Sequence, residues 1–209
     1  VVLRGLHPVR SSGGQRHVLW IISHPEAVDD RELDGADLVL VASPRFADHV
    51  RGRTATPVEV MLQATDHRRF APRPVDPAHR HDVTVVAKTR DVLRPVVADA
   101  LAAGLRPAIY GGGWRELVDP SLVVADHVDN EVLPTVYSSA GVVLNDHWGS
   151  MRAWGFVSNR LFDVLACGTP VISDAVDGIA ELFDGAVPEY RHPAELRALV
   201  DEVLADPSA

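Results

Sequence analysis

The stretch GFVSNRLFDVLACGTPVISD, Gly155–Asp174, has the pattern of a helix followed by a buried strand. Apolar residues recur at helical spacing in its first half, Gly168 can end the helix, and an apolar strand begins at Pro170. Ser158 or Asn159 can cap the helix, whose exposed N–H groups favour an anion such as phosphate. The stretch therefore predicts one helix–strand unit of an α/β sheet, with a candidate anion site at the start of the helix.

Strands and helices alternate on both sides of this stretch. The expected strands lie at Val83–Ala87, Pro107–Tyr110, Leu122–Val124, Gly141–Leu144 and Pro170–Ser173. The expected helices lie at Asp91–Ala103, Glu131–Ser139, Asn159–Cys167, Asp177–Phe183 and Ala194–Leu204. Alternation with short connections predicts a doubly wound, Rossmann-like parallel sheet with right-handed crossovers. Ligands of such sheets bind at the carboxyl ends of the strands.

The first part of the chain has the same character but fewer elements. Apolar runs at His17–Ser23, Asp37–Ser43 and Val58–Leu62 predict buried strands, and Asp29–Leu33 and Pro44–Arg51 have the pattern of helices. Three strands are too few for a complete doubly wound domain. We therefore expect residues 1–75 to be the C-terminal part of one Rossmann-like domain and residues 76–209 to be a second one. The chain begins at Val1 rather than Met, so we expect an upstream piece.

The two predicted domains are joined by a stretch rich in proline and charge, Phe70–His81, which is the best linker candidate because proline restricts the backbone and removes a hydrogen-bond donor. Its two histidines, His79 and His81, have no cysteine or acidic partners at metal spacing, and we take them to be solvated.

Composition limits the class of protein. The chain has 209 residues, 46% of them hydrophobic, and a net charge of −9, which does not fit a nucleic-acid binder. No apolar run reaches the roughly 18–20 residues of a membrane-spanning helix, so membrane association has no support in the sequence. The single cysteine, Cys167, fits a reducing compartment. These features predict a soluble, cytoplasmic protein.

Several catalytic motifs are absent from the sequence. There is no D-x-D pair for a metal-bridged donor, no G-x-S-x-G elbow, no P-loop and no H-E-x-x-H. Gly111–Gly113 does not form a dinucleotide fingerprint, and we interpret it as a loop of close backbone approach.

Asp163, His24 and the only lysine, Lys88, remain as candidates for chemistry. Asp163 lies off the apolar stripe of its helix, where its carboxylate either accepts hydrogen bonds from vicinal hydroxyls such as those of a ribose or only complements the helix dipole. His24 follows a buried strand and is either a structural group or a ligand contact. Lys88 follows the first strand of the second domain and is either solvated or placed for an anion.

Four stretches together resemble GT-B glycosyltransferases, which have two facing Rossmann-like domains, and most closely family 4 and the CgeB-like "group 1" set. Gly155–Asp174 resembles their nucleotide-sugar-binding core, and HVLWIISHP resembles the strand that ends in a sugar-facing histidine. VEVMLQATDHRRFAP, Val58–Pro72, resembles the signature "v.viPNGvD...F.P", with Gln63–Asp66 in place of Asn-Gly-Val-Asp. EVLPTVYSSAGVVL, Glu131–Leu144, resembles the helix and strand that precede the core.

The resemblance implies transfer of a sugar from a nucleotide-diphospho-sugar to a sugar, lipid-linked or small-molecule acceptor, with retention of configuration and without a metal or other cofactor. It implies that Lys88 and Arg90 stabilise the departing diphosphate, that Asp163 holds the ribose, and that His24 contacts the sugar across the cleft. It also implies that the loop of Phe156, Val157 and Ser158 faces the phosphates with its backbone amides. Arg160 either adds a contact to the donor or pairs with Asp163. The residues expected to bind the donor are Gly111, Gly112, Val128, Asn145, Asp146, His147, Gly155, Phe156, Val157, Ser158, Asn159, Arg160 and Asp163.

The sequence departs from the family at one position. Eight residues before Asp163, Gly155 replaces the first glutamate of the family's E-x7-E pattern. Either the preceding loop is one residue longer and Asn145, Asp146 or His147 supplies the sugar contacts, or the activity is lost. Two alternatives therefore stay open beside the transferase, namely a nucleotide-sugar epimerase of the same architecture and a non-catalytic sugar-nucleotide-binding module.

Overall fold

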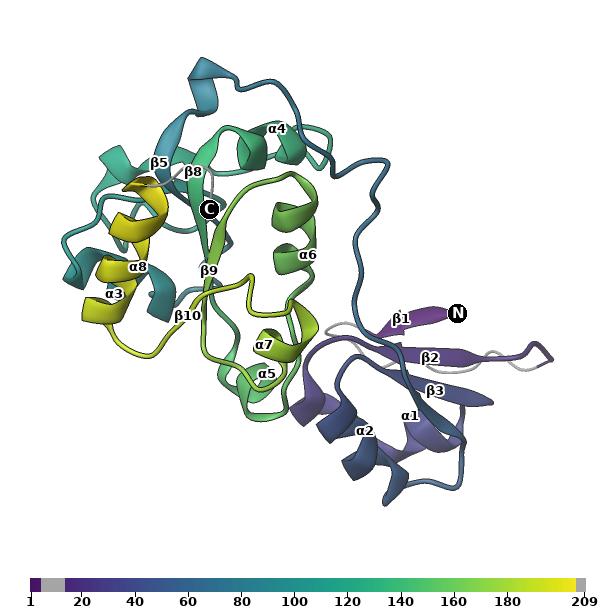
Figure 1. Cartoon of the computed structure of the whole chain (residues 1–209). Coiled ribbons are helices and arrows are strands. Elements are labelled where there is room, and N and C mark those ends of the chain that lie inside the picture. The colour runs from purple at the N-terminus through teal and green to yellow at the C-terminus, as the bar shows by residue number, and fades with distance from the viewer. Residues whose placement is uncertain (5–13, 206–209) are drawn as a thin grey trace. The chain divides into compact units, whose positions relative to one another are not determined.

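The computed structural model describes residues 1–4 and 14–205, and it contains two separate parallel sheets (Figure 1). Within the described residues the first sheet has four strands in the order β1-β2-β3-β4. They are β1 (Val2–Arg4), β2 (Val18–Ile21), β3 (Leu38–Val41) and β4 (Val58–Val60). Each neighbouring pair is parallel.

The second sheet has the order β10-β9-β8-β5-β6-β7, again with parallel pairs only. Its strands are β5 (His81–Val86), β6 (Ala108–Tyr110), β7 (Val123–Ala125), β8 (Ala140–Asn145), β9 (Val171–Asp174) and β10 (Glu189–Tyr190). Chain order runs outward from β5 in one direction and from β8 in the other, which is the doubly wound arrangement. The predicted α/β fold class is confirmed.

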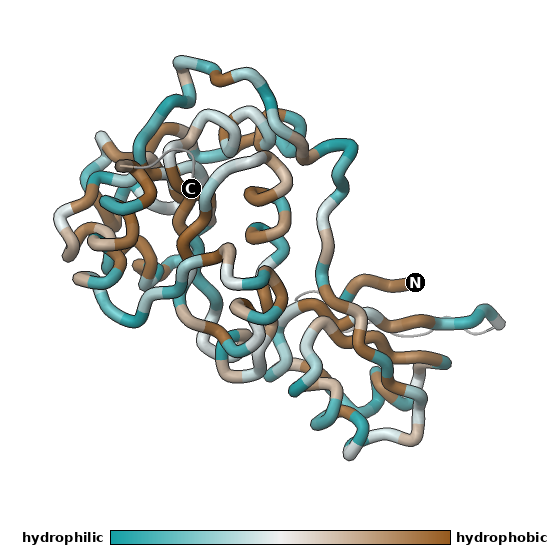
Figure 2. Tube along the Cα trace, viewed as in Figure 1, coloured by the Kyte–Doolittle hydropathy of each residue, from teal (hydrophilic) through white to brown (hydrophobic). Residues whose placement is uncertain are grey.

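Helices cover both faces of the second sheet. Figure 1 shows α3 (Pro95–Ala102) and α8 (Pro193–Ala205) on one face and α4 (Leu133–Ser138) and α6 (Asn159–Ala166) on the other. The main core lies under α3 and α8, where side chains such as Val97, Ile109 and Ile172 are fully buried. The apolar strands run through the interior in Figure 2. Burying each such side chain contributes about 1.5–3 kcal/mol to the stability of the fold. The strands are continuous apolar runs because helices cover both faces of the sheet.

In the first sheet's unit the helical elements are η1 (Pro25–Ala27), α1 (Asp30–Asp34) and α2 (Pro44–Arg51). Ser43 caps α2 by accepting a hydrogen bond from the Phe46 amide at 3.1 Å, and Asp29 with Glu32 forms a capping box on α1. Phe46 is buried against strands β2 and β3 and also against Phe156. This explains why a short, mostly polar helix such as α2 is stable: one face supplies apolar anchors.

The remaining elements are η2 (Pro77–His79), η3 (Pro120–Leu122), α5 (Gly149–Ala153) and α7 (Ile179–Leu182). Contacts divide the chain into two compact units. The first contains 1–63, 147–158 and 176–179, and the second contains 64–146, 159–175 and 180–209. Ala64 onward packs with the second unit, and the amides of Arg73 and Asp76 donate to the hydroxyls of Ser138 and Ser139 there. The domain boundary expected near residue 75 stays a prediction.

The sequence reading missed or displaced a few elements. It missed β1, β10 and α5, which are two to five residues long and carry too short a pattern to be recognised. The helix expected to begin at Asp91 begins at Pro95 instead. Arg90 and Asp91 adopt left-handed backbone angles, with φ of 52° and 63°, so the chain makes a loop before the helix can start.

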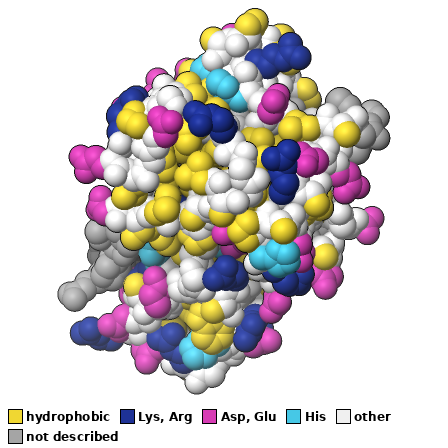
Figure 3. Space-filling view, turned by 90° about the vertical axis from the view of Figure 1, so that its left-hand side faces the viewer, with side chains coloured by type: hydrophobic (Ala, Val, Ile, Leu, Met, Phe, Trp, Pro, Cys, Tyr) yellow, Lys and Arg dark blue, Asp and Glu magenta, His cyan; other side chains and the backbone are white. Residues whose placement is uncertain are grey.

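Figure 3 shows basic side chains scattered among aspartates and glutamates on the face it displays. No helix in the described part of the chain has the length and apolar composition needed to cross a membrane.

The glycines after β6 let two strand ends approach closely. A Cβ on Gly111, whose φ is 137°, would lie 2.1 Å from the carbonyl oxygen of Ala87, and one on Gly113 would lie 2.3 Å from Thr89 Oγ1. The buried Trp114 donates its indole N–H to the same Ala87 oxygen at 2.6 Å. The interpretation of Gly111–Gly113 as a close-approach loop is confirmed.

The histidines of the proline-rich stretch were expected to be solvated, and this is wrong. His79 Nδ1 lies 3.0 Å from the hydroxyl of the buried Tyr110, and His81 packs edge-on against the Tyr110 ring at 6.2 Å. His81 Nε2 is buried with no hydrogen-bond partner. The cause is the tight return of the chain into β5, which places both rings on Tyr110.

We predict that Gly111→Ala lowers the free energy of unfolding by about 3 kcal/mol, because the new Cβ would clash with backbone that cannot move cheaply. Gly104→Ala is the matched control, since Gly104 also has a left-handed φ of 72° but nothing within 4 Å of a Cβ. It is expected to cost about 1 kcal/mol from backbone strain alone. Urea unfolding of both variants measures the difference, and equal losses would contradict the close approach.

We also predict that His81 makes the protein less stable in mild acid. Burial and the neighbouring His79 lower the pKa of His81 from 6.5, although Asp82 opposes the change. In the unfolded chain His81 binds a proton as the pH falls below about 6.5, whereas the folded protein resists protonation until its lower pKa is reached. The melting temperature of His81→Gln should therefore fall less between pH 7.5 and 5.5 than that of wild type. The variant His67→Gln, at an exposed position, should behave like wild type.

Candidate functional site

In the second sheet the strand order reverses between β5 and β8, which are hydrogen-bonded neighbours: β6 and β7 follow on one side, and β9 and β10 follow on the other. In a doubly wound sheet this switch point leaves a crevice at the carboxyl ends of the two strands, where ligands bind. The segments that leave those ends are the loop 87–94 after β5 and Asp146 after β8. Lys88 and Arg90, which the sequence predicts to bind the diphosphate, lie on the loop after β5.

Lys88 and Arg90 are both exposed on the loop after β5, on either side of the buried Thr89. The Thr89 amide donates to the Gly112 carbonyl at 3.2 Å, and its hydroxyl accepts from the Asp91 amide at 3.1 Å. The buried Thr89 thus anchors the loop, and the side chains of Lys88 and Arg90 are exposed. This is an arrangement suited to binding an anion by charge.

A buried ion pair ties the ends of β5 and β8 together. Arg94 donates to the carboxylate of Asp146 and, at 3.2 Å, to its carbonyl oxygen. The same carboxylate accepts from the Val96 amide at 3.4 Å, so it also caps helix α3. Asp146 is only 4% exposed. It was expected among the donor contacts, and the structure places it beneath the crevice in contact with Arg94.

A cavity of about 270 Å³ in the second unit brings together Asn159, Arg160 and Asp163. The Asn159 amide donates to Asp163 Oδ2 at 3.1 Å. Arg160 donates to Asn145 Oδ1 at 2.7 Å, and Asn145 donates to Ser173 Oγ at 3.0 Å. The Asn145 side chain thus orients Arg160, whose charge also acts on Asp163 and opposes the rise of its pKa. The expected pairing of Arg160 with Asp163 stays a prediction.

Asp163 is the buried carboxylate of this cavity. It is 7% exposed and is the fifth residue of α6. A carboxylate complements the helix dipole most strongly in the first turn, and Asp163 lies beyond that turn. Burial raises the pKa of Asp163, while the side chains of Thr65, Asn159 and Arg160 oppose the rise. The position fits a carboxylate that accepts hydrogen bonds from a ligand better than it fits a group that only complements the dipole.

The other side chains that line this cavity were not singled out from the sequence. They are Arg69, Phe70, Val86, Asn130, Leu133 and Tyr137. Phe70 and Tyr137 belong to two of the quoted family stretches, so the pattern contained a signal for them. Arg69 and Asn130 are ordinary polar residues of irregular segments, and only the fold places them here.

The expected phosphate loop belongs to the first unit. The Phe156 amide donates to the Met151 carbonyl at 2.9 Å, and the Ser158 amide donates to His147 Nε2 at 2.9 Å. The carbonyl of Val157 accepts from the side chain of Gln63. Two of the three amides expected to face phosphate therefore already have acceptors inside the protein. Gly155, with φ of 68°, makes the turn into this loop.

His24 also lies in the first unit, half-buried, with a left-handed φ of 53°. Its Nδ1 lies 2.9 Å from the hydroxyl of Ser23. Its carbonyl oxygen accepts from the fully buried Arg4, which also pairs with Glu32 at 3.2 Å. The sequence reading did not identify Arg4, because a single arginine near the start of a chain carries no pattern.

Gly111 makes the close approach described above, the carbonyl of Gly112 accepts a hydrogen bond from the Thr89 amide, and Val128 is partly buried against the cluster of Ala108, Tyr110 and Val136. The structure thus gathers the expected residues in two places. Lys88, Arg90, Asn145, Asp146, Asn159, Arg160 and Asp163 lie in the second unit, and His24 and the segment 147–158 lie in the first. The roles of these residues in binding stay predictions.

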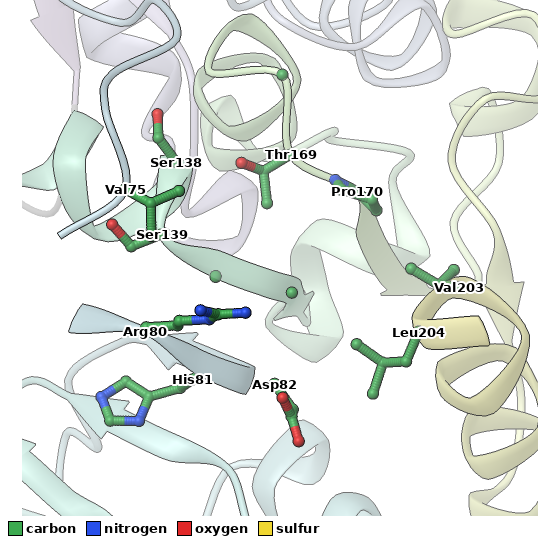
Figure 4. Close-up of a pocket in the computed structure, with 13 residues that line it drawn as sticks. Val75, Arg80, His81, Asp82, Ser138, Ser139, Thr169, Pro170, Val203 and Leu204 are labelled. Carbon is green, nitrogen blue, oxygen red and sulfur yellow. The ribbon is translucent and has the colours of Figure 1, made fainter. Parts of the chain in front are cut away.

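A larger cavity of about 590 Å³ lies elsewhere on the second unit (Figure 4). Its lining comes from the amino ends of β5, β8 and β9 and from the end of α8, the edge opposite the crevice. Arg80 points into it, and none of the expected donor contacts lines it. Among residues 1–4 and 14–205 no group of three or more histidine, cysteine, aspartate or glutamate side chains could hold a metal ion.

Solved structures with a similar fold extend over nearly the whole chain. Sucrose-phosphate synthase from Thermosynechococcus elongatus matches with a TM-score of 0.63 at 19% identity, covering 91% of this chain and 59% of that one. HepE of Anabaena, solved with UDP and glucose, matches with a TM-score of 0.63 at 14% identity, covering 92% and 63%. AviGT4, a glycosyltransferase involved in avilamycin A biosynthesis, matches with a TM-score of 0.53 at 17% identity, covering 92% and 68%.

The chain thus spans about three fifths of the first two structures, and at these identities the likeness shows the fold, which is that of GT-B glycosyltransferases. No curated protein shows a significant match to the sequence. The family described as "Glycosyl transferase-like" matches residues 80–209, more than half of the chain. The chain therefore belongs to the glycosyl transferase-like family.

Proposed function

We propose that the protein transfers a sugar from a nucleotide-diphospho-sugar to an acceptor, with retention of configuration and without a metal ion. The observation that carries this proposal is the cavity of Asn159, Arg160 and Asp163, in the same unit as the cationic loop of Lys88 and Arg90. A buried carboxylate suits the hydroxyls of a ribose, and two exposed cations suit a diphosphate. A nucleoside diphosphate has both groups.

Each part of the donor has a proposed partner. Asp163 holds the ribose, and Lys88 with Arg90 binds the diphosphate and stabilises its charge as the glycosidic bond breaks. Because two side-chain cations can offset that charge, the reaction needs no metal in this scheme. Arg160, oriented by Asn145, adds a charge-assisted contact at the cavity. His24 contacts the reacting sugar.

A solved structure with a similar fold supports the substrate class. HepE of Anabaena was solved with UDP and glucose, and this chain has a similar fold. A nucleotide-sugar donor for this protein is our extension of that likeness. The acceptor is a sugar, a lipid-linked saccharide or a small molecule, and we expect the reaction to occur in the cytoplasm, where the one cysteine, buried as a free thiol, would stay reduced.

One observation favours a second candidate, a sugar-nucleotide-binding module without catalysis. Gly155 stands where the family has a glutamate, and the neighbouring amides of Phe156 and Ser158 are already hydrogen-bonded. Incubation with a radiolabelled nucleotide-sugar and a broad acceptor panel separates the candidates. A transferase forms product, a binding module binds without turnover, and an epimerase changes the sugar of UDP-N-acetylglucosamine when no acceptor is present. Absence of binding to UDP, GDP, dTDP and their sugars by calorimetry would overturn the proposal.

We predict that Lys88→Ala weakens binding of the preferred nucleoside diphosphate about tenfold, which is about 1.4 kcal/mol, because one charge-assisted contact to phosphate is lost. Binding of the nucleoside without phosphates should not change. Arg106→Ala serves as the control, since Arg106 is an exposed cation of the same unit that precedes β6 rather than following a strand. Calorimetry on both variants tests this, and an equal loss for nucleoside and diphosphate would place Lys88 elsewhere.

We predict that Asp163→Asn removes the preference for a ribose. In wild type the 2′-deoxy form of the preferred nucleoside diphosphate should bind about tenfold more weakly than the ribo form, because one hydroxyl donor to the carboxylate is missing. The variant should bind both forms about equally. Binding by wild type should also weaken as the pH falls through the raised pKa of Asp163, since only the carboxylate accepts both hydrogen bonds. Glu181→Gln, at an exposed position on α7, is the control for loss of one carboxylate.

A further inference from the structure

The side chain of Gln63 joins two segments that are far apart in the sequence. Its amide nitrogen lies 3.2 Å from the carbonyl oxygen of Ile22 and 2.9 Å from that of Val157. Gln63 is only 9% exposed, and all three residues belong to the first unit. Two carbonyl acceptors require two N–H donors on one atom, which the primary amide of glutamine supplies.

Each of the two carbonyls lies next to a group of the proposed site. Ile22 lies two residues before His24, in the turn where the Ser23 hydroxyl lies 2.9 Å from the His24 ring. Val157 shares its peptide group with the Ser158 amide, which donates to His147 Nε2. The peptide between residues 157 and 158 is therefore held at its oxygen by Gln63 and at its N–H by His147.

Other contacts hold the ends of the same two segments. Arg4 holds the His24 carbonyl, and the Ser43 hydroxyl donates to the Trp154 carbonyl. The side chain of Gln63 contacts both the segment 22–24 and the loop 155–158. Loss of its amide would remove both of these hydrogen bonds and loosen the link between the two segments, while each segment keeps its other contacts in the first unit.

We propose that Gln63 is a positioning residue that fixes the position of His24 relative to the loop 155–158. His24, which contacts the sugar in the proposed function, and this loop then move together. This inference rests on the proposed function for its catalytic consequence. The carboxylate of Gln63→Glu would repel both carbonyls, and Gln63→Met would fill the same space without donors. Small displacements of reacting groups are costly, since about 1 Å can reduce turnover on the order of 100-fold.

The first test measures the coupling without any substrate. Hydrogen exchange of the Ser158 amide should become at least about tenfold faster in Gln63→Glu and Gln63→Met, because its peptide group loses the hydrogen bond on the carbonyl side. The ring nitrogen resonances of a ¹⁵N-labelled His24 should shift in the same variants. Thr56→Val is the matched control, since Thr56 donates to the Leu33 carbonyl at 2.9 Å in the same unit and contacts neither segment.

A merely structural role would lower stability in Gln63→Met and Thr56→Val alike and leave the Ser158 and His24 signals of both variants unchanged. That result would overturn the proposal.

The second test measures turnover of the nucleotide-sugar that wild type uses. For Gln63→Met we expect kcat to fall on the order of 10- to 100-fold while the Kd of the free nucleoside diphosphate changes less than about threefold, because the cationic loop and Asp163 are untouched. Equal losses in kcat and nucleotide affinity would overturn the catalytic part. If wild type binds no nucleotide, the proposed function fails, and the exchange and resonance measurements still decide whether Gln63 couples the two segments.

Discussion

Parallel strand pairing is the constraint on which the rest of this structure depends. In the described part of the chain every strand pair of both sheets is parallel, so all strands of a sheet end at one edge and their following loops meet there. In the second sheet the reversal between β5 and β8 opens a crevice at that edge. Because β5 and β8 are neighbours, the loop that carries Lys88 and Arg90 leaves the same edge of the sheet as Asp146, although more than fifty residues separate Lys88 from Asp146.

Bringing loops together at one edge requires close backbone contact and buried polar anchors. Glycine at 111 and 113 permits the contact between the loops after β5 and β6. The anchors are Arg94 with Asp146 in the second unit and Arg4 with Glu32 in the first. Leaving one partner of such a buried pair alone typically costs about 3–5 kcal/mol, so each pair holds its loop in a single arrangement. Gln63 also anchors two segments, through neutral hydrogen bonds to the carbonyl oxygens of Ile22 and Val157 rather than through an ion pair.

Much of the fold could be predicted because its signals are local. Strands β2, β3, β5, β8 and β9 are apolar runs bounded by turn residues, and α6 shows its apolar stripe directly. The elements that were missed, β1, β10 and α5, are short and are held by their neighbours rather than by their own pattern. The start of α3 was misplaced because Arg90 and Asp91 take left-handed angles that the residue types do not announce.

For the candidate site, the sequence by itself determined which residue types follow the strands: a lone lysine, an aspartate on a helix and a histidine after an apolar run. The family pattern extended that set to neighbouring positions. Only the tertiary structure decided that Asp146 lies under Arg94, that Arg160 is oriented by Asn145, and that Gln63 bridges Ile22 and Val157. These contacts span 15 to 94 residues along the chain, and hydrogen bonds at such separations depend on how strands and loops pack, which no local pattern of residues encodes.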